Sequence, residues 1–248
     1  MLDYKTEAAA YDATRGGVPR AESAARAVLG LVPESARTLL DIGCGTGLVT
    51  QRIAAARPGL KVLGTDASYG MARLARQRIG AVALGDARRK LPLGAATVDA
   101  VGAIWLLHLL RGAGDARAVV SEAARVLGPG GVFVTTVDKD AAHDVGSDID
   151  EAFAPYLRPK PSDSEELVAA YGAEAGLDVV GEARFLGHGQ GRTPLAAARS
   201  VRSGDFVSRL ELPGAAADRL AAALLALPDG DRPRRDPEYR LLVFRRRD

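Results

Sequence analysis

The segment from Asp41 to Gly47 carries glycine at every second position from residue 43 onward. It follows a short apolar run and precedes a helical pattern, so it is expected to connect a buried strand to a helix. Glycine has no Cβ, and the backbone of such a turn approaches a ligand closely. The dinucleotide fingerprint requires G-x-G-x-x-G, but Leu48 stands where its third glycine belongs. The turn therefore predicts a ligand site that is not built to hold a pyrophosphate.

A carboxylate follows each of the next two strand-like runs. Asp66 comes after the run 61–65, and Asp86 comes after the run 81–84. A carboxylate at the end of the second strand accepts hydrogen bonds from two ribose hydroxyls and repels a 2′-phosphate. The turn and the two carboxylates together predict a site for a nucleoside without phosphates. The glycine spacing also argues against a nicotinamide-dependent oxidoreductase.

These residues need a scaffold that brings strand ends together. Short apolar runs alternate with segments of helical period, which predicts a parallel sheet with helices on both faces. The expected strands are residues 38–42, 61–65, 81–84, 97–104, 132–137, 178–184 and 239–245. The expected helices are residues 21–32, a helix from Leu48, and residues 68–79, 116–127, 164–175, 194–202 and 215–226. Proline cannot continue a helix, so the helix over 116–127 is expected to stop at the run Gly128-Pro129-Gly130-Gly131.

Five segments, in this order and spacing, resemble the class I S-adenosylmethionine-dependent methyltransferases. They are LLDIGCGTG at 39–47, GTDAS at 64–68 with Met71, GDA at 85–87 followed by LPL at 91–93, ATVDAV at 96–101, and RVLGPGG at 125–131. The similarity covers residues 38–137 and is closest to the small-molecule branch related to quinone-biosynthesis enzymes. It implies a doubly wound, mostly parallel seven-stranded sheet of the Rossmann-like methyltransferase fold, with an antiparallel last strand and a helical cap inserted before it. It also implies S-adenosylmethionine as cofactor and S-adenosylhomocysteine as product.

The resemblance assigns cofactor contacts to matching positions. Asp41 and the backbone at Gly43, Gly45 and Gly47 would border the methionine part, and Asp66 would hold the ribose. Ala67 and Met71 would touch adenine, Asp86 would accept from its amino group, and the Ala87 amide would face a ring nitrogen. The backbone around Ala103 to Trp105, with Ile104 at its centre, would face the methionyl ammonium.

The segment from Tyr11 to Gly16 resembles the N-terminal arm that many relatives fold over the cofactor. Arg15 would pair with the methionyl carboxylate, and Tyr11 would lie beside it. The alternative is a surface arm whose tyrosine packs on the first helix.

A hydroxyl acceptor needs a base, and the sequence offers few. His108 lies four residues beyond the fourth strand, where relatives often carry a histidine, and His188 lies in the glycine-rich bend 187–191. The alternatives are a packed His108 among leucines and a solvent-exposed His188. His143 and Asp138, after the fifth strand, are further candidates. The residues alone do not choose among the four.

The expected organisation is one domain over residues 1–248. It comprises an N-terminal lid arm at 1–20, a cofactor-binding core at 21–137 and a C-terminal part at 138–248 with a substrate cap at about 187–230. A cap of this kind encloses a small acceptor. The Asn-Pro-Pro-aromatic tetrapeptide of enzymes that methylate nucleic-acid amino groups or glutamine is replaced by Ile104-Trp105-Leu106-Leu107, which argues against such targets.

Composition narrows the remaining classes. A net charge of +2 among 248 residues argues against nucleic acid as a partner, although arginines concentrate near the C-terminus. Cys44 is the only cysteine, which excludes a disulfide within the chain and a zinc site of several thiolates, and no metal is expected. A charged N-terminus and the lack of an apolar run of roughly 18 residues predict a cytoplasmic protein without membrane contact. An RNA methyltransferase and a catalytically silent cofactor-binding regulator stay as alternatives, and a monomer and a homodimer are both open. High alanine, arginine and glycine usage is typical of GC-rich genomes, where such enzymes modify secondary metabolites.

Overall fold

The computed structural model describes residues 11–110, 112–158, 162–206 and 209–248. Its strands are β1 (Thr38–Ile42), β2 (Lys61–Asp66), β3 (Val82–Leu84), β4 (Val98–Ala103), β5 (Leu127–Val137), β6 (Leu177–Leu186) and β7 (Glu238–Arg246). Its α-helices are α1 (Tyr11–Thr14), α2 (Gly17–Leu31), α3 (Leu48–Ala56), α4 (Tyr69–Ile79), α5 (Ala113–Val126), α6 (Asp148–Phe153), α7 (Glu165–Glu174), α8 (Pro194–Ser203) and α9 (Ala216–Leu225). Three short 3₁₀ turns, η1 (Leu107–Leu109), η2 (Ala141–His143) and η3 (Ala154–Tyr156), connect them. Half of the expected N-terminal arm, residues 1–10, lies outside the described residues.

The strands form one seven-stranded sheet in the order β3-β2-β1-β4-β5-β7-β6. The first five pair in parallel, and β7 pairs antiparallel with both β5 and β6. The carboxyl ends of β1, β2 and β4 therefore meet at one edge, where the order reverses between β1 and β4. This topology confirms the fold predicted from the sequence.

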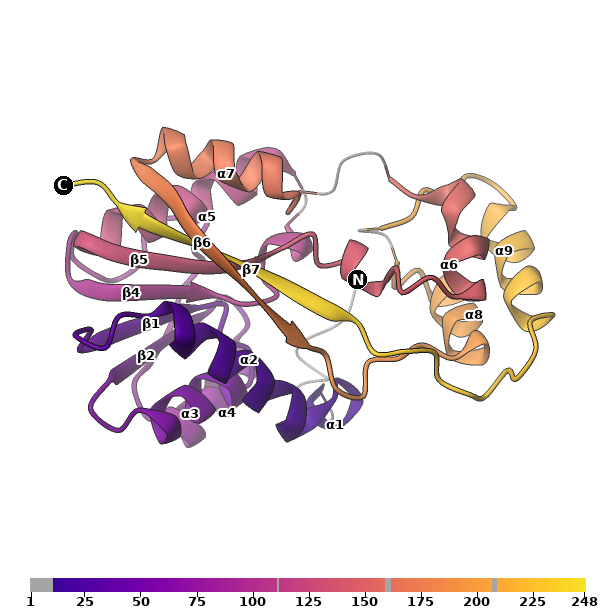
Figure 1. The fold of residues 1–248 in the computed structure, drawn as a ribbon, viewed down its shortest axis with the longest axis horizontal. Coiled ribbons are helices and arrows are strands. Elements are labelled where there is room, and N and C mark those ends of the chain that lie inside the picture. The colour runs from indigo at the N-terminus through magenta and orange to yellow at the C-terminus, as the bar shows by residue number, and fades with distance from the viewer. Residues whose placement is uncertain (1–10, 111, 159–161, 207–208) are drawn as a thin grey trace.

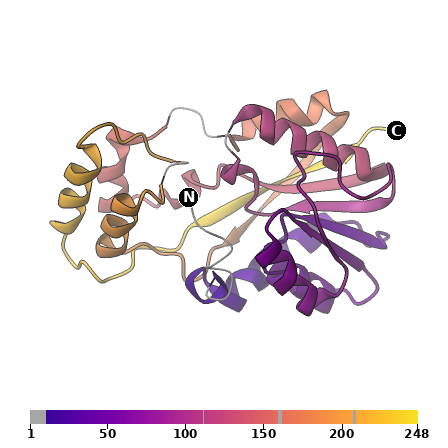
Figure 2. The ribbon, with the colours of Figure 1, turned by 180° about the vertical axis from the view of Figure 1, so that it is seen from behind.

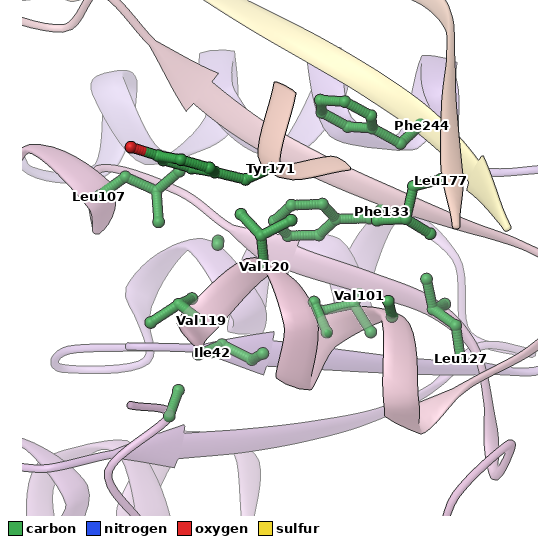
Figure 3. Close-up of a cluster of buried hydrophobic side chains, with 14 of the residues drawn as sticks. Ile42, Val101, Leu107, Val119, Val120, Leu127, Phe133, Tyr171, Leu177 and Phe244 are labelled. Carbon is green, nitrogen blue, oxygen red and sulfur yellow. The ribbon is translucent and has the colours of Figure 1, made fainter. Parts of the chain in front are cut away.

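Helices cover both faces of the sheet (Figure 1). One core lies between the sheet and α5 and α7, and the other lies between the sheet and α2 and α3. In the first core the rings of Phe133 on β5 and Phe244 on β7 stack with centroids 5.8 Å apart, and Val120 and Tyr171 pack against the same layer (Figure 3). Because β1 and residues 132–137 of β5 are buried on both faces, they read as nearly continuous apolar runs.

Two local features differ from the prediction. Helix α5 ends at Val126, and Leu127 is already the first residue of β5. Leu127 is fully buried and pairs with Val98, so its side chain is better placed on a strand than on another helical turn. The glycine-proline run after Leu127 forms an irregular part of β5, with a register shift in its pairing to β4. Helix α6 was not predicted, although Ser147 and Asp150 form a capping box at its start.

Helices α6, α8 and α9 pack together beyond the carboxyl end of β5, at one side of the sheet (Figures 1 and 2). They share a separate apolar cluster that includes Ile149, Phe153, Val201, Leu220 and Leu224. The proposed cap therefore contains α6 in addition to the segment expected at 187–230. Among the described residues, no helix combines the length and apolarity needed to cross a membrane.

Candidate functional site

A pocket of about 470 Å³ opens at the carboxyl ends of β1, β2, β3 and β4, and α1 lies against it. The volume is in the range of small-molecule sites. The predicted residues that line it are Tyr11, Arg15, Asp41, Gly43, Gly45, Asp66, Ala67, Met71, Asp86, Ala87 and Ile104. The structure thus gathers around one cavity every position assigned to the cofactor except Gly47.

The glycines of the turn share a left-handed backbone conformation but differ in what they contact. All have positive φ, 68° at Gly43, 57° at Gly45 and 77° at Gly47. A Cβ on Gly45 would meet no atom within 4 Å, so this backbone faces open space in the pocket wall. A Cβ on Gly47 would lie 2.9 Å from the Ala75 Cα. Gly47 therefore serves the close packing of α3 on α4, and the structure does not place it at the pocket.

Asp66 is held in one orientation by the backbone. Its Oδ2 accepts from the Gly45 amide at 2.9 Å, and its Oδ1 accepts from the Ser68 amide at 2.8 Å. Burial raises the pKa of Asp66, and the two amide bonds act in the opposite direction. Each carboxylate oxygen retains further lone-pair capacity, because an ionised carboxylate accepts about four hydrogen bonds.

Asp41 is only 4% exposed at the end of β1. The Thr50 hydroxyl on α3 donates to its Oδ2 at 2.5 Å. Burial nevertheless raises the pKa of Asp41 to about 7, with the charge of Asp66 adding to the shift. A cation placed in the pocket would therefore bind next to a carboxyl group that is ready to ionise.

Asp86 is engaged by an arginine that the sequence analysis did not identify. Arg88 donates from Nε to Asp86 Oδ1 at 2.9 Å and from Nη2 to Oδ2 at 2.7 Å. The same guanidinium reaches Asp115 on α5 at 3.5 Å. The Arg88 side chain holds the pKa of Asp86 below its usual value, and Arg88 itself lines the pocket. In the sequence, an aspartate and an arginine two positions apart look like the charged residues of any exposed loop. Their spacing therefore did not predict this ion pair.

Helix α1 is fastened to the glycine-rich turn. Asp12 Oδ1 accepts from the Thr46 hydroxyl at 2.7 Å, and Asp12 Oδ2 lies 2.6 Å from Arg78 Nη2. Arg78 also donates to the Thr46 carbonyl at 3.0 Å. These contacts hold Tyr11 and Arg15 at the pocket, and the Arg15 guanidinium carbon lies 5.9 Å from the centre of the Tyr11 ring. The position of the described part of the arm agrees with a covering role.

Arg20 and the side chain of Trp105 form another part of the wall; the sequence had indicated only the backbone of Trp105. Trp105, just after β4, has a φ of 54°, a conformation that costs a non-glycine residue free energy and is found at functional sites. The Arg20 guanidinium carbon lies 3.5 Å from the centre of the Trp105 ring, and Arg20 is only 7% exposed. Arg20 lies on the same face of α2 as the buried Ala24 and Val28. An arginine on an apolar helix face was the sequence signal that could have identified it.

In the part of the chain that the structure describes, none of the three histidines named as candidate bases lines the pocket. His108 is buried in η1, and this burial lowers the pKa of its imidazole well below the usual value. The His188 side chain is exposed in the bend 187–191, and the His188 carbonyl oxygen lies close to Gly16. His143 is also buried, with Nε2 3.2 Å from the Tyr239 hydroxyl. Asp138 accepts from the Glu165 amide at the start of α7.

Comparisons with known proteins find similarity in the central segment. Residues 40–135 match the family model described as a methyltransferase domain. A trans-aconitate 2-methyltransferase from Azoarcus sp. is 34% identical over 118 residues, which are 47% of this chain and 46% of the relative. A demethylmenaquinone methyltransferase from Symbiobacterium thermophilum is 37% identical over 105 residues, 39% of this chain and 40% of the relative. The chain thus covers less than half of each of these curated relatives.

Solved structures share the fold over most of the chain. The [4+2]-cyclase SpnF has a TM-score of 0.61 at 19% identity, over 98% of this chain and 93% of that one. A SAM-dependent methyltransferase from Methanosarcina mazei has a TM-score of 0.56 at 12% identity, over 89% and 96% of the two chains. At these sequence identities the likeness shows the fold alone, because one fold supports many different activities.

Proposed function

We propose that this chain, whose residues 40–135 match the family model of a methyltransferase domain, transfers a methyl group from S-adenosylmethionine to a small-molecule acceptor. The observation that carries the proposal is the placement of Asp66. Its carboxylate is fixed by two backbone amides next to the open face of Gly45. This is the arrangement that a ribose without a 2′-phosphate requires.

The residues of the pocket fit the cofactor from end to end. Asp66 accepts from the ribose hydroxyls, Asp86 and the Ala87 amide face the adenine, and Met71 packs against it. Asp41 offers negative charge to the methionyl ammonium, and Arg15 offers a guanidinium to the carboxylate. The bound cofactor supplies an electrophilic methyl group on a sulfonium.

The chain contributes positioning and exclusion of water. Helix α1, fastened through Asp12, covers one side of the pocket, and Trp105 with Leu106 forms another. Neither His108 nor His188 lines the cavity, so the acceptor is one that needs little help in losing a proton. We propose an enolised carbon, an amine nitrogen or an already ionised oxygen as the acceptor atom. Helices α6, α8 and α9 would form the cap over the acceptor.

An RNA substrate gains no support from the arginine-rich C-terminal region. Arg234 pairs with Asp148 at 2.6 Å, and Arg247 pairs with Asp178 at 2.6 Å. Arg240 lies against both Glu165 and Glu182. These arginines form ion pairs with carboxylates of the same chain. The pairing argues for a charged, solvated edge and against an RNA-binding surface.

Calorimetry with S-adenosylmethionine tests the proposal. We expect saturable binding by the wild-type protein, and an Asp66→Ala variant should bind at least about a hundredfold more weakly, because two hydrogen bonds to a charged group contribute roughly 1.5–3 kcal/mol each. Asp218→Ala, an exposed carboxylate change on α9, is the control and should bind like the wild type. Turnover with any acceptor in a metabolite panel would exclude a catalytically silent regulator. A folded wild-type protein without affinity for the cofactor would refute the proposal.

A further inference from the structure

Four cationic side chains gather between the pocket and the helices α6, α8 and α9. We call Arg20, Lys139, Arg192 and Arg209 the cationic junction. Arg20 and Arg209 are 7% and 5% exposed, and the Lys139 side chain is 18% exposed. The four residues come from α2, from the turn after β5, and from the loops on either side of α8. They are far apart in the sequence and meet only in the folded chain.

Aromatic rings connect the junction to the pocket. The Arg20 guanidinium carbon lies 3.5 Å from the centre of the Trp105 ring and 5.6 Å from that of Tyr239. On the side of the helices, Arg192 lies 4.9 Å from the centre of the Phe206 ring, and Arg209 lies 5.4 Å from that of Phe153. Arg20 lines the pocket itself. The junction therefore begins at the pocket wall and continues toward the helices.

Carboxylates offset part of the positive charge. Lys139 Nζ lies 2.9 Å from Asp140 Oδ1, and Arg209 Nη2 lies 3.7 Å from Asp150 Oδ1. The buried Asp163 accepts from the Lys139 amide at 2.9 Å. Among the described residues, three carboxylates near the junction, Asp140, Asp150 and Asp163, are buried, and the exposed Asp144 also acts on Arg209. The charges of the junction are therefore largely offset, and what it offers a ligand is hydrogen-bond donors.

The unpartnered polar atoms of this region are mostly donors. In the described part of the chain, the buried N–H groups without a partner include Arg20 Nε, Trp105 Nε1, Arg192 Nη1, and Arg209 Nε and Nη1. Two other atoms nearby also lack a partner, His108 Nδ1 and Asp163 Oδ1. A buried donor without a partner costs roughly 1–3 kcal/mol. A ligand with acceptor oxygens would satisfy such donors.

The pKa values of the junction residues also favour a bound anion. Burial lowers the pKa of Arg192 to about 10, and the nearby Arg209 adds to the effect. Burial likewise lowers the pKa values of Lys139 and Arg20, while Asp140 opposes the shift at Lys139. These groups repel one another in a desolvated place, so a bound anion would stabilise them.

We propose that the methyl acceptor is a small organic acid, whose carboxylate binds Arg20 at the junction side of the pocket with Arg192 and Lys139 behind it. This inference rests on the proposed methyl transfer and adds the chemical class of the acceptor. The carboxylate and the guanidinium of Arg20 would form charge-assisted hydrogen bonds in a site that excludes water. The acid group would thereby orient the acceptor toward the cofactor pocket.

Matched pairs of acids and amides test the inference without any variant. The probes are phenylacetate with phenylacetamide, hexanoate with hexanamide, and trans-aconitate with its triamide, each titrated into protein saturated with S-adenosylhomocysteine. We expect at least one acid to bind about tenfold or more tightly than its amide, since the charge contributes at least about 1.4 kcal/mol. Amides that bind as tightly as their acids, or a panel in which no acid binds, would overturn the inference.

Variants locate the site. Arg192 does not line the cofactor pocket, so Arg192→Met should weaken binding of the acid by about tenfold or more and leave affinity for S-adenosylhomocysteine unchanged. Arg202→Met, an exposed change on α8, is the matched control. If Arg192→Met fails to fold by circular dichroism, Lys139→Met serves the same purpose. Equal acid affinity in the variant and the wild type would overturn the inference.

The two proposals fail in different ways. A wild-type protein that does not bind S-adenosylhomocysteine contradicts the proposed function. A protein that binds it with normal affinity, yet treats acids and amides alike, contradicts only the acidic acceptor.

Discussion

An alanine at Gly45 should have two separable effects, a loss of stability from backbone strain and a loss of affinity for the cofactor. Gly45 has a φ of 57° in the pocket wall, and a Cβ there would meet no atom of the described residues within 4 Å. Gly204, at the end of α8, has a φ of 77° and a ψ of 23°, and a Cβ there likewise meets no described residue within 4 Å. An alanine at either position adopts a left-handed conformation at a cost of about 1–2 kcal/mol. Both variants should therefore lose similar stability, with about 2–4 °C lost in Tm for each kcal/mol.

Only the alanine at position 45 should affect the cofactor. Carbon atoms in contact lie about 3.5–4.0 Å apart, and a Cβ extends about 1.5 Å from the Cα. A cofactor atom seated on the Gly45 Cα would then lie only about 2–2.5 Å from the new methyl group, so it must move or leave. We expect Gly45→Ala to lose at least about tenfold in affinity for S-adenosylmethionine, or about 1.4 kcal/mol.

The assay combines thermal melting by circular dichroism with calorimetric titration of the wild type, Gly45→Ala and Gly204→Ala. The stability loss should be shared by the two variants, and the affinity loss should be confined to Gly45→Ala. If Gly45→Ala binds the cofactor as tightly as Gly204→Ala does, the glycine faces solvent and the proposed placement of the cofactor is refuted.

Two further predictions concern the groups around the turn. Because burial raises the pKa of Asp41 to about 7, a bound cation should lower it, release protons and make cofactor affinity rise as the pH increases through 7. Titration in two buffers of different ionisation enthalpy measures the release, and identical observed enthalpies would contradict it. Asp12→Ala removes the contacts to Thr46 and Arg78 and should weaken cofactor binding severalfold. Its effect should be smaller in an Arg78→Met background, where only the contact to Thr46 is left to remove, and full additivity would show that Asp12 and Arg78 do not act together.

The core of the site was predictable from the sequence because its determinants are local. Asp41, Asp66 and Asp86 each stand at the end of a strand or in the turn after it. Carboxyl ends of parallel strands meet at one edge of the sheet, so their place in the sequence already implied their place in space. The assignment of Gly43 and Gly45 to the pocket came from the same turn, and residues 40–135 match the model of a methyltransferase domain.

Other features depended on contacts that the local pattern does not encode. Gly47 packs on Ala75 because α4 returns to that side of the sheet, and Leu127 joins β5 because Val98 pairs with it. A spacing of glycines does not reveal which of them faces a neighbouring helix. The role of each glycine was decided by packing.

The sequence by itself determined the sheet, the glycine-rich turn and the carboxylates, since short-range patterns specify strands, turns and the residues directly after them. The tertiary structure decided which polar side chains are buried together. It put the three candidate histidines outside the pocket, paired Arg88 with Asp86 and brought the cationic junction together from separate segments. Burial sets the charge and hydrogen bonding of such groups, and burial is a property of the folded chain.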